Sequence, residues 1–107
     1  MKYMMLVCGD EAIQAPPDIE PNTVGWLEEM EGRGVRLTGD ALRPVSDATT
    51  VRVRNGEVLL SDGPFAETKE QILGFDILDA SDLDEAIEIA SKHPVARYGC
   101  LEIRPFR

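Results

Sequence analysis

The stretch VRVRNGEVLL, residues 51–60, divides the chain into two halves. Valine and arginine alternate before Asn55 and Gly56, and Glu57 with three aliphatic residues follows them. Asn-Gly is the dipeptide that most readily adopts the positive φ angles of a type I′ turn. The stretch therefore predicts a β-hairpin, with one strand on each side of the turn.

Each half of the chain supplies two further strands and one helix. Before the hairpin, apolar runs predict strands at residues 3–8 and 35–42, with a proline-containing loop over residues 9–21. Val24, Leu27 and Met30 have helical spacing, with Asn22 or Thr23 as N-cap candidates and Gly34 as the end signal. After the hairpin, strands are predicted at residues 72–78 and 98–104. The helix between these two strands carries an apolar stripe from Leu83 to Ala90, with Ser81 as its expected cap.

Without the hairpin, the order of elements is β-α-β-β-α-β. This order predicts an α+β fold of the ferredoxin-like type, with a 4-1-3-2 sheet and an extra β-hairpin, as a single domain over residues 1–107. In such a sheet the ends of the first two strands meet the beginnings of the last two. Asp10, Asp40, the segment 61–64 and His93 are expected at that edge, where loops often hold functional residues.

Strand alternation also predicts what each face of the sheet carries. Arg36 and Asp40 of the second strand and Arg104 of the last strand are expected on the face away from the helices. That face also receives Met4 and Leu6. Such a mixture of apolar and charged residues is typical of a subunit interface or a ligand cleft.

The charge balance argues against two classes of partner. Eleven Lys and Arg stand against twenty Asp and Glu, which gives a net charge of −9. Nucleic-acid binding depends on basic residues that neutralise phosphates, and an anionic membrane surface would repel the chain. The basic residues concentrate in residues 33–54 and 92–107, each with a net charge of +3. A small anionic ligand near Arg36 and Arg104 is therefore expected, with no direct binding of nucleic acid and no membrane segment.

The two cysteines, Cys8 and Cys100, are too few for a disulfide scaffold, and they indicate a reducing, cytoplasmic setting. Antiparallel pairing of the first and last strands would make them neighbours. They are interpreted as small core residues, with a redox pair as the alternative. No metal-ligand spacing and no nucleotide-binding motif is present, so neither a metal nor a cofactor is predicted.

The segment after the hairpin, SDGPFAETKE at residues 61–70, combines a turn, an aromatic residue, acids and a lysine. The part DGPFAETKE closely resembles the signature of the YCII-related family, in its DGPF-motif branch. The opening residues 2–4, the strand end GDALRP at 39–44, the pair His93-Pro94 and the close LEIRP at 101–105 are also similar to that family.

The resemblance implies a dimeric α+β barrel of ferredoxin-like subunits, with a cleft between the sheet and the partner. Some members of the wider group act on chlorinated aromatic compounds through a His-Asp pair. Members of the DGPF branch often accompany extracytoplasmic-function sigma factors. The catalytic members carry their histidine in the first half of the chain, whereas this sequence has no histidine before His93. The family dyad therefore cannot be transferred by position.

Three functional hypotheses follow. The first is a homodimeric protein that binds a small molecule, with expected ligand contacts at Asp40, Asp62, Glu67, Lys69, Arg36 and Arg104. The second is a lyase- or hydrolase-type enzyme in which His93 and Asp62 form an acid-base pair, since histidine titrates near neutral pH. The alternative for His93 is a cap at a helix C-terminus. The third hypothesis is an accessory partner of a sigma factor.

Overall fold

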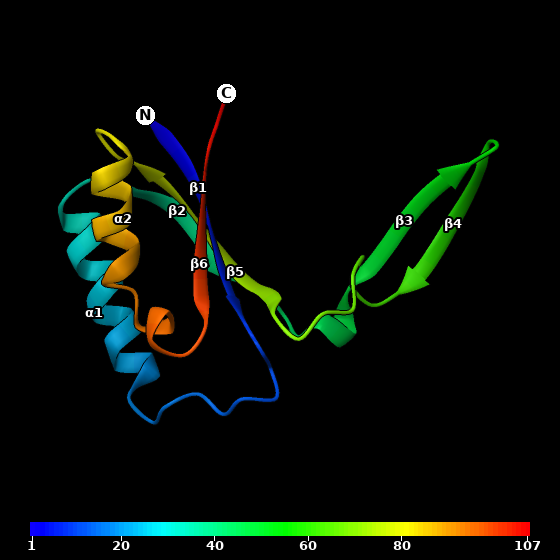
Figure 1. The fold of residues 1–107 in the computed structure, drawn as a ribbon, viewed down its shortest axis with the longest axis horizontal. Coiled ribbons are helices and arrows are strands. Elements are labelled where there is room, and N and C mark those ends of the chain that lie inside the picture. Colours follow the sequence, from blue (N-terminus) through cyan, green and yellow to red (C-terminus); the bar gives the residue numbers. More distant parts are fainter.

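Four antiparallel strands form the centre of the computed structural model, which describes residues 1–107. Two helices cover one face of this sheet, and a separate two-stranded hairpin extends away from it (Figure 1). The strands and helices, in chain order, are β1 (Lys2–Gly9), α1 (Ile19–Gly32), β2 (Arg36–Ala41), β3 (Thr49–Arg54), β4 (Glu57–Asp62), β5 (Gln71–Asp79), α2 (Leu83–Ser91) and β6 (Cys100–Pro105). Short 3-10 turns η1 (Val45–Asp47) and η2 (Pro94–Arg97) lie before β3 and β6.

The strand order of the large sheet is β2-β5-β1-β6. When the hairpin is set aside, this is the predicted 4-1-3-2 order, so the ferredoxin-like α+β prediction is confirmed. β1 and β5 are the two central strands, and they pair along their whole length from Lys2 opposite Asp79 to Gly9 opposite Gln71.

The first helix begins earlier than the apolar spacing predicts. α1 starts at Ile19, with Asp18 at the N-cap, so Pro21 lies inside the first turn and not in a loop. Proline is tolerated there because backbone N–H groups of the first turn have no partner within the helix. The predicted end is confirmed, because Gly34 takes a φ of 72° just after the helix.

The second helix has a different cap from the expected Ser81. The carboxylate of Asp82 accepts a hydrogen bond of 2.8 Å from the Glu85 N–H, and the Glu85 carboxylate accepts one of 2.9 Å from the Ser81 N–H. This reciprocal pair is a capping box shifted by one residue. His93 does not cap the C-terminus of α2, where the C-cap residue is Lys92. It stands instead at the N-cap of η2.

The hydrophobic core lies between the helices and the sheet. Tyr3, Met5 and Val7 point from β1 toward the helices, and Trp26 and Met30 of α1 pack against the same cluster. The Trp26 indole N–H donates a hydrogen bond of 2.9 Å to the Ile89 carbonyl, which joins the two helices. Trp26 is therefore a core residue.

Arg36 does not lie on the predicted face of the sheet. The register of β2 against β5 shifts between Arg36 and Thr38, and this irregularity breaks the simple alternation. The Arg36 side chain points to the helix side, where it contacts Glu31 of α1 and Asp76 of β5. After the shift, Asp40 pairs with Phe75. This pairing agrees with the face away from the helices that alternation predicts for Asp40.

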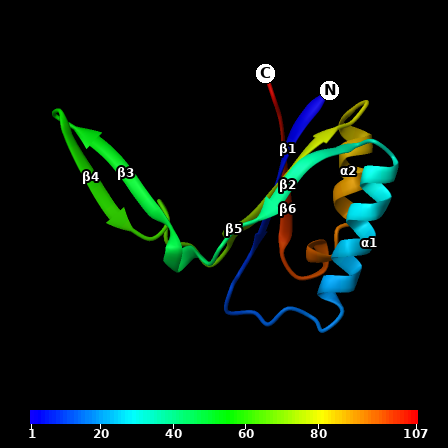
Figure 2. The same ribbon diagram turned by 180° about the vertical axis from the view of Figure 1, so that it is seen from behind.

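The hairpin is confirmed, with Asn55 and Gly56 at φ angles of 52° and 79°. Its strands β3 and β4 pair only with each other, and they form an arm that projects from the body in both views (Figures 1 and 2). The radius of gyration, 15.6 Å, exceeds the roughly 13 Å typical of this chain length. One face of the arm presents four aliphatic side chains that are each more than half exposed, namely Val51, Val53, Val58 and Leu60. We call these four residues the arm strip.

No helix in the structure has the length and apolar character needed to cross a membrane.

The two ends of α1 offer a test of the packing. Met30 is fully buried, whereas Val24 is 51% exposed on the same helix. Met30→Ala should lower the free energy of unfolding by about 2–5 kcal/mol because it leaves a cavity. Val24→Ala should change it by less than about 0.5 kcal/mol. Urea denaturation of both variants measures the difference, and equal effects would contradict this assignment of the core face.

Candidate functional site

The sheet edge predicted from topology carries two hollows. The ends of β1 and β2 and the beginnings of β5 and β6 meet there, as the antiparallel pairings require. One hollow lies against the signature segment 61–70, and we call it the signature pocket. The other lies between α1 and the sheet, and we call it the helix cleft. Asp10 lines the signature pocket, while Asp40 and His93 line the helix cleft.

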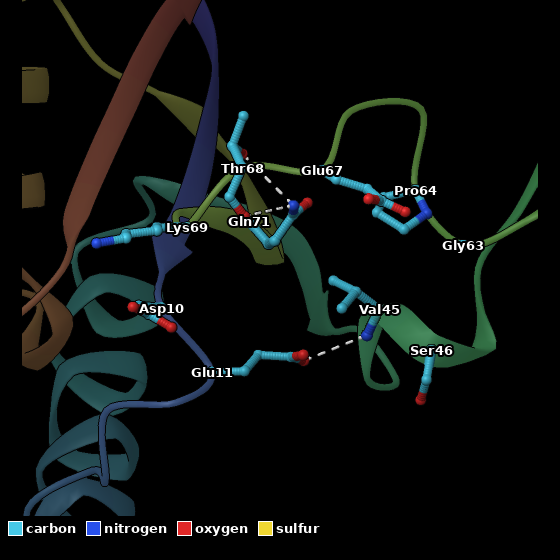
Figure 3. Close-up of a pocket in the computed structure, with 10 residues that line it drawn as sticks. All are labelled: Asp10, Glu11, Val45, Ser46, Gly63, Pro64, Glu67, Thr68, Lys69 and Gln71. Atoms are coloured by element: carbon cyan, nitrogen blue, oxygen red, sulfur yellow. Dashed lines mark hydrogen bonds between the residues drawn. The ribbon is translucent and has the colours of Figure 1, made fainter.

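The signature pocket is an open hollow of about 590 Å³ (Figure 3). The Gln71 amide shapes its wall by donating hydrogen bonds of 2.9 Å to the Ala66 carbonyl and 2.8 Å to the Thr68 carbonyl. Across the pocket, the Glu11 carboxylate accepts a hydrogen bond of 3.2 Å from the Val45 N–H. The residues that line it are Asp10, Glu11, Val45, Ser46, Gly63, Pro64, Glu67, Thr68, Lys69 and Gln71.

The charges of this pocket do not favour an anion. Lys69 is its only basic residue, and the carboxylates of Asp10, Glu11 and Glu67 surround the same space. In Figure 3, Lys69 extends on the side of Asp10, whereas Glu67 lies beside Pro64. Lys69 forms no ion pair, so its ammonium group is free to contact a ligand.

The helix cleft has a volume of about 500 Å³, within the range of small-molecule sites. Thr23 and Leu27 of α1 form one wall, and β2 and β5 form the other. Two of its polar residues, Asp76 and His93, are buried, although charged and polar side chains rarely are.

Asp76 is a carboxylate held inside the protein. Its Oδ1 accepts a hydrogen bond of 2.7 Å from Arg36 Nε, and Arg36 Nη1 reaches Glu31 at 2.8 Å. The side chains of Asp76 and Arg36 are only 8% and 13% exposed. Burial raises the pKa of Asp76, and the hydrogen bond from Arg36 opposes that rise. A buried carboxylate with a raised pKa is a stronger base than an exposed one.

A glycine on β2 makes room for this carboxylate. A Cβ at Gly39 would lie 2.4 Å from Asp76 Oδ1 and 2.3 Å from the Phe75 carbonyl oxygen. Both distances are shorter than atoms can approach without displacement. The absence of a side chain at Gly39 is therefore a condition for the position of Asp76.

His93 presents a defined tautomer to the cleft. Its Nδ1 accepts a hydrogen bond of 3.1 Å from the Val95 N–H, so the neutral ring carries its proton on Nε2. The ring packs edge-on against Trp26, with centroids 4.7 Å apart. His93 is one of the residues that line the helix cleft. Burial lowers the pKa of His93 to about 4.

The structure separates the residues that sequence analysis grouped. It does not bring His93 and Asp62 together, because Asp62 ends β4 on the arm, paired with Thr49 and exposed. The hairpin leaves the sheet and carries Asp62 with it. Glu67 and Lys69 line the signature pocket.

The expected basic ligand contacts are occupied by carboxylates. Arg36 is engaged by Asp76 and Glu31, while Arg104 pairs with Glu102 on the helix-free face of β6. Arg36, Asp40 and His93 share the helix cleft, so three of the predicted site residues do lie around one cavity.

Sequence analysis missed Asp76, although a signal was present. Asp76 interrupts the apolar run from Ile72 to Leu78 in β5, at the alternation position shared by Gly74 and Leu78. Those neighbours face the helices, and an acid at such a position needs a partner inside the protein. A search for charged residues on buried strand positions would have identified it.

Comparisons with known proteins extend these observations. A family model described as YCII-related domain matches residues 1–107. An uncharacterized protein of Rhizobium meliloti, R00369, is 47% identical over 122 residues, which covers 98% of this chain and 91% of that protein.

A solved structure shares the fold at low sequence identity. It is the 5-chloro-2-hydroxyhydroquinone dehydrochlorinase of Burkholderia phenoliruptrix in complex with 2,5-dihydroxybenzoquinone. The match has a TM-score of 0.52 and 12% identity, and it covers 100% of this chain and 94% of the other. At this identity the likeness concerns the fold alone.

Two glycine variants test the position of Asp76. Gly39→Ala should destabilise the protein by about 1–3 kcal/mol, because the new methyl group must displace the Asp76 carboxylate or the Phe75 carbonyl. Gly25→Ala, on exposed α1 surface with nothing within 4 Å, should stabilise by about 0.5–1 kcal/mol. Thermal or urea unfolding measures both. A neutral effect of Gly39→Ala would show that the contact is not restrictive.

The depressed pKa of His93 predicts a pH dependence of stability. The unfolded imidazole titrates near pH 6.5 and the folded one near 4. The folded state therefore favours the neutral ring. The contribution of the neutral His93 ring to the free energy of unfolding is complete above about pH 6.5 and is lost as the pH falls toward 4. Between pH 7 and pH 4, the free energy of unfolding of the wild type should fall by on the order of 3 kcal/mol more than that of His93→Asn. Urea denaturation at each pH measures both. Parallel pH profiles would contradict the buried neutral ring.

Proposed function

Because the chain belongs to the YCII-related family, we propose that it is a lyase-type enzyme that acts on a small molecule in the helix cleft. The observation that carries this proposal is the placement of a buried carboxylate, Asp76, and a neutral imidazole, His93, on the walls of one cavity of about 500 Å³. Pairs of titratable groups whose pKa values are shifted by their surroundings are characteristic of acid-base sites.

The two groups have different roles. Asp76 is the general base, since burial raises the pKa of its carboxyl and Arg36 holds one oxygen at 2.7 Å. His93 is a hydrogen-bond donor through Nε2–H, because Val95 occupies Nδ1 and the ring is neutral at pH 7. Together they suit the removal of a proton from a substrate while the donor stabilises the negative charge that develops on an oxygen.

The charges around the cleft favour a neutral substrate. Arg36 is already neutralised by Asp76 and Glu31. An anion would gain no free cation there. We therefore infer a neutral substrate that carries a hydroxyl or carbonyl group for His93 and a proton within reach of Asp76.

The structural neighbour supports the same reaction class. Its name describes a dehydrochlorinase that acts on a hydroxylated ring. Removal of hydrogen chloride begins with the kind of proton abstraction that Asp76 could perform. The association with a sigma factor, which the DGPF resemblance implies, stays a prediction.

The proposal can be tested with the compound named for that neighbour, 5-chloro-2-hydroxyhydroquinone, and with a panel of related neutral phenols. A compound that binds should raise the melting temperature. For a compound that is converted, Asp76→Asn should lower kcat by at least about 10²-fold, because the amide cannot accept the proton. Chloride release or substrate absorbance measures turnover.

Lys69→Gln is the matched control, since it removes a charge from the signature pocket and leaves the helix cleft unchanged. It should leave both binding and turnover intact. The opposite pattern, in which Lys69→Gln abolishes binding and Asp76→Asn preserves turnover, would place the site in the signature pocket and refute the assignment.

We also propose that the protein is a homodimer, with a second copy covering the arm strip. A two-stranded hairpin with one apolar face is marginal in water on its own. At the base of the arm, a hollow lined by Val51, Phe65 and Ile72 continues the arm strip toward the helix-free face of the sheet. The same face carries the half-buried Met4 and Leu6. An interface built from these apolar residues suits a twofold arrangement, in which each copy offers the same patch.

Light scattering should give about twice the 11.8 kDa mass of one chain. Leu60→Lys, on the arm strip, should shift the equilibrium toward the monomer. Leu59→Lys lies on the opposite face of the same strand and should have a smaller effect. A monomeric wild type, or equal effects of the two variants, would refute this interface.

A further inference from the structure

We propose that Cys8 and Cys100 form a reversible cross-strand disulfide, and that this bond releases the signature segment from β6. The pair lies outside the helix cleft, and the proposed reaction does not use it. The inference depends on the register of the sheet and on one hydrogen bond between Cys100 and Glu70.

The register places the two thiols opposite each other. Cys8 of β1 and Cys100 of β6 are direct partners in the antiparallel ladder, so both side chains leave the same face of the sheet. Directly opposed residues have Cα atoms about 4.5 or 5.5 Å apart, depending on their hydrogen bonding. Both spacings fall within the range of disulfides. Formation of the bond therefore requires only side-chain rotation and small local shifts.

Both cysteines are free thiols, and Cys100 is exposed. They line a small hollow of about 190 Å³, together with Phe65, Glu70 and Glu102. This hollow gives a small oxidant access to the sulfur atoms. The pair lies at the sheet edge where the signature segment returns to β5.

The hydrogen bond that connects the pair to the signature segment is donated by the Cys100 thiol. Its Sγ lies 3.2 Å from Glu70 Oε2, and Glu70 is the last residue of the segment 61–70. A disulfide sulfur carries no proton and cannot donate this bond. Oxidation therefore removes the contact between β6 and the end of the signature segment.

The reaction balances with hydrogen peroxide as the oxidant. The Cys100 thiol loses its proton, and its sulfur attacks a peroxide oxygen to give a sulfenic acid and water. The Cys8 sulfur then attacks the Cys100 sulfur, the S–S bond forms and a second water leaves. The two sulfurs together lose two electrons, which the peroxide oxygens gain. A dithiol reverses the bond by exchange.

Glu70 also limits the rate of this reaction. Its carboxylate accepts a hydrogen bond from the protonated thiol and, with burial, raises the pKa of Cys100 to about 11. The thiolate, which is the reactive form, is therefore scarce at neutral pH. The pair responds to sustained oxidation and not to brief exposure.

The test treats the reduced full-length protein with millimolar hydrogen peroxide. The expected product is a chain with no disulfide to a second chain that is lighter by about 2 Da, with both thiols lost to alkylation and restored by dithiothreitol. Peptide mapping should join the peptides of Cys8 and Cys100. A chain that keeps both thiols, gains oxygen atoms, or forms only disulfides between chains would overturn the proposal.

Hydrogen–deuterium exchange tests the release of the signature segment. Deuterium uptake over residues 63–71 should increase in the oxidised protein and return to its initial level after reduction. Cys8→Ser cannot form the disulfide, and its Cys100 keeps a donor to Glu70 either as the thiol or as the sulfenic acid S–OH, so its uptake should stay close to the reduced level. Cys100→Ser keeps a hydroxyl donor and should behave in the same way. Unchanged uptake in the oxidised wild type would overturn the coupling to the segment.

Discussion

The ion pair between Asp76 and Arg36 is the interaction on which the helix cleft depends. It joins the central strand β5 to the edge strand β2, and the second bond of Arg36 to Glu31 extends the connection to α1. All three elements form walls of the cleft. Because both members are largely buried, removing either one would leave an unpaired charge inside the protein, which costs about 3–5 kcal/mol. The same pair that supports the cleft supplies the base we assign to it.

The proposed chemistry depends on how the surroundings restrict each group. His93 loses its usual role as a base near neutral pH because it is buried and because Val95 occupies Nδ1. What remains is an Nε2–H donor on a residue that lines the cavity. Asp76 changes in the opposite sense, since burial makes its carboxyl easier to protonate. A single histidine in the chain is therefore sufficient for an acid-base site, provided that a carboxylate supplies the basic function.

The arm separates the signature segment from the helix cleft. Since β3 and β4 pair only with each other, they leave the main sheet and carry Asp62 with them, while residues 63–71 return along the signature pocket. The signature motif thus lies beside the proposed site and does not form it. Its last residue, Glu70, contacts β6 through Cys100, and this contact connects the segment to the thiol pair.

The sequence alone determined the order of strands and helices, the type I′ turn at Asn55 and Gly56, the end of α1 at Gly34 and the family signature. These features depend on local φ preferences and on the spacing of apolar residues, and both can be recognised in the sequence. It also placed Cys8 opposite Cys100, because the strand order determined their pairing.

Which charged residues share a cavity depends on the packing of the folded chain. The register shift at Arg36 turned that side chain toward the helices, and burial selected Asp76 in place of Asp62 as the carboxylate near His93. Both outcomes arise from contacts between residues that are far apart in sequence. Desolvation and long-range pairing depend on the packed fold, and no local pattern encodes them.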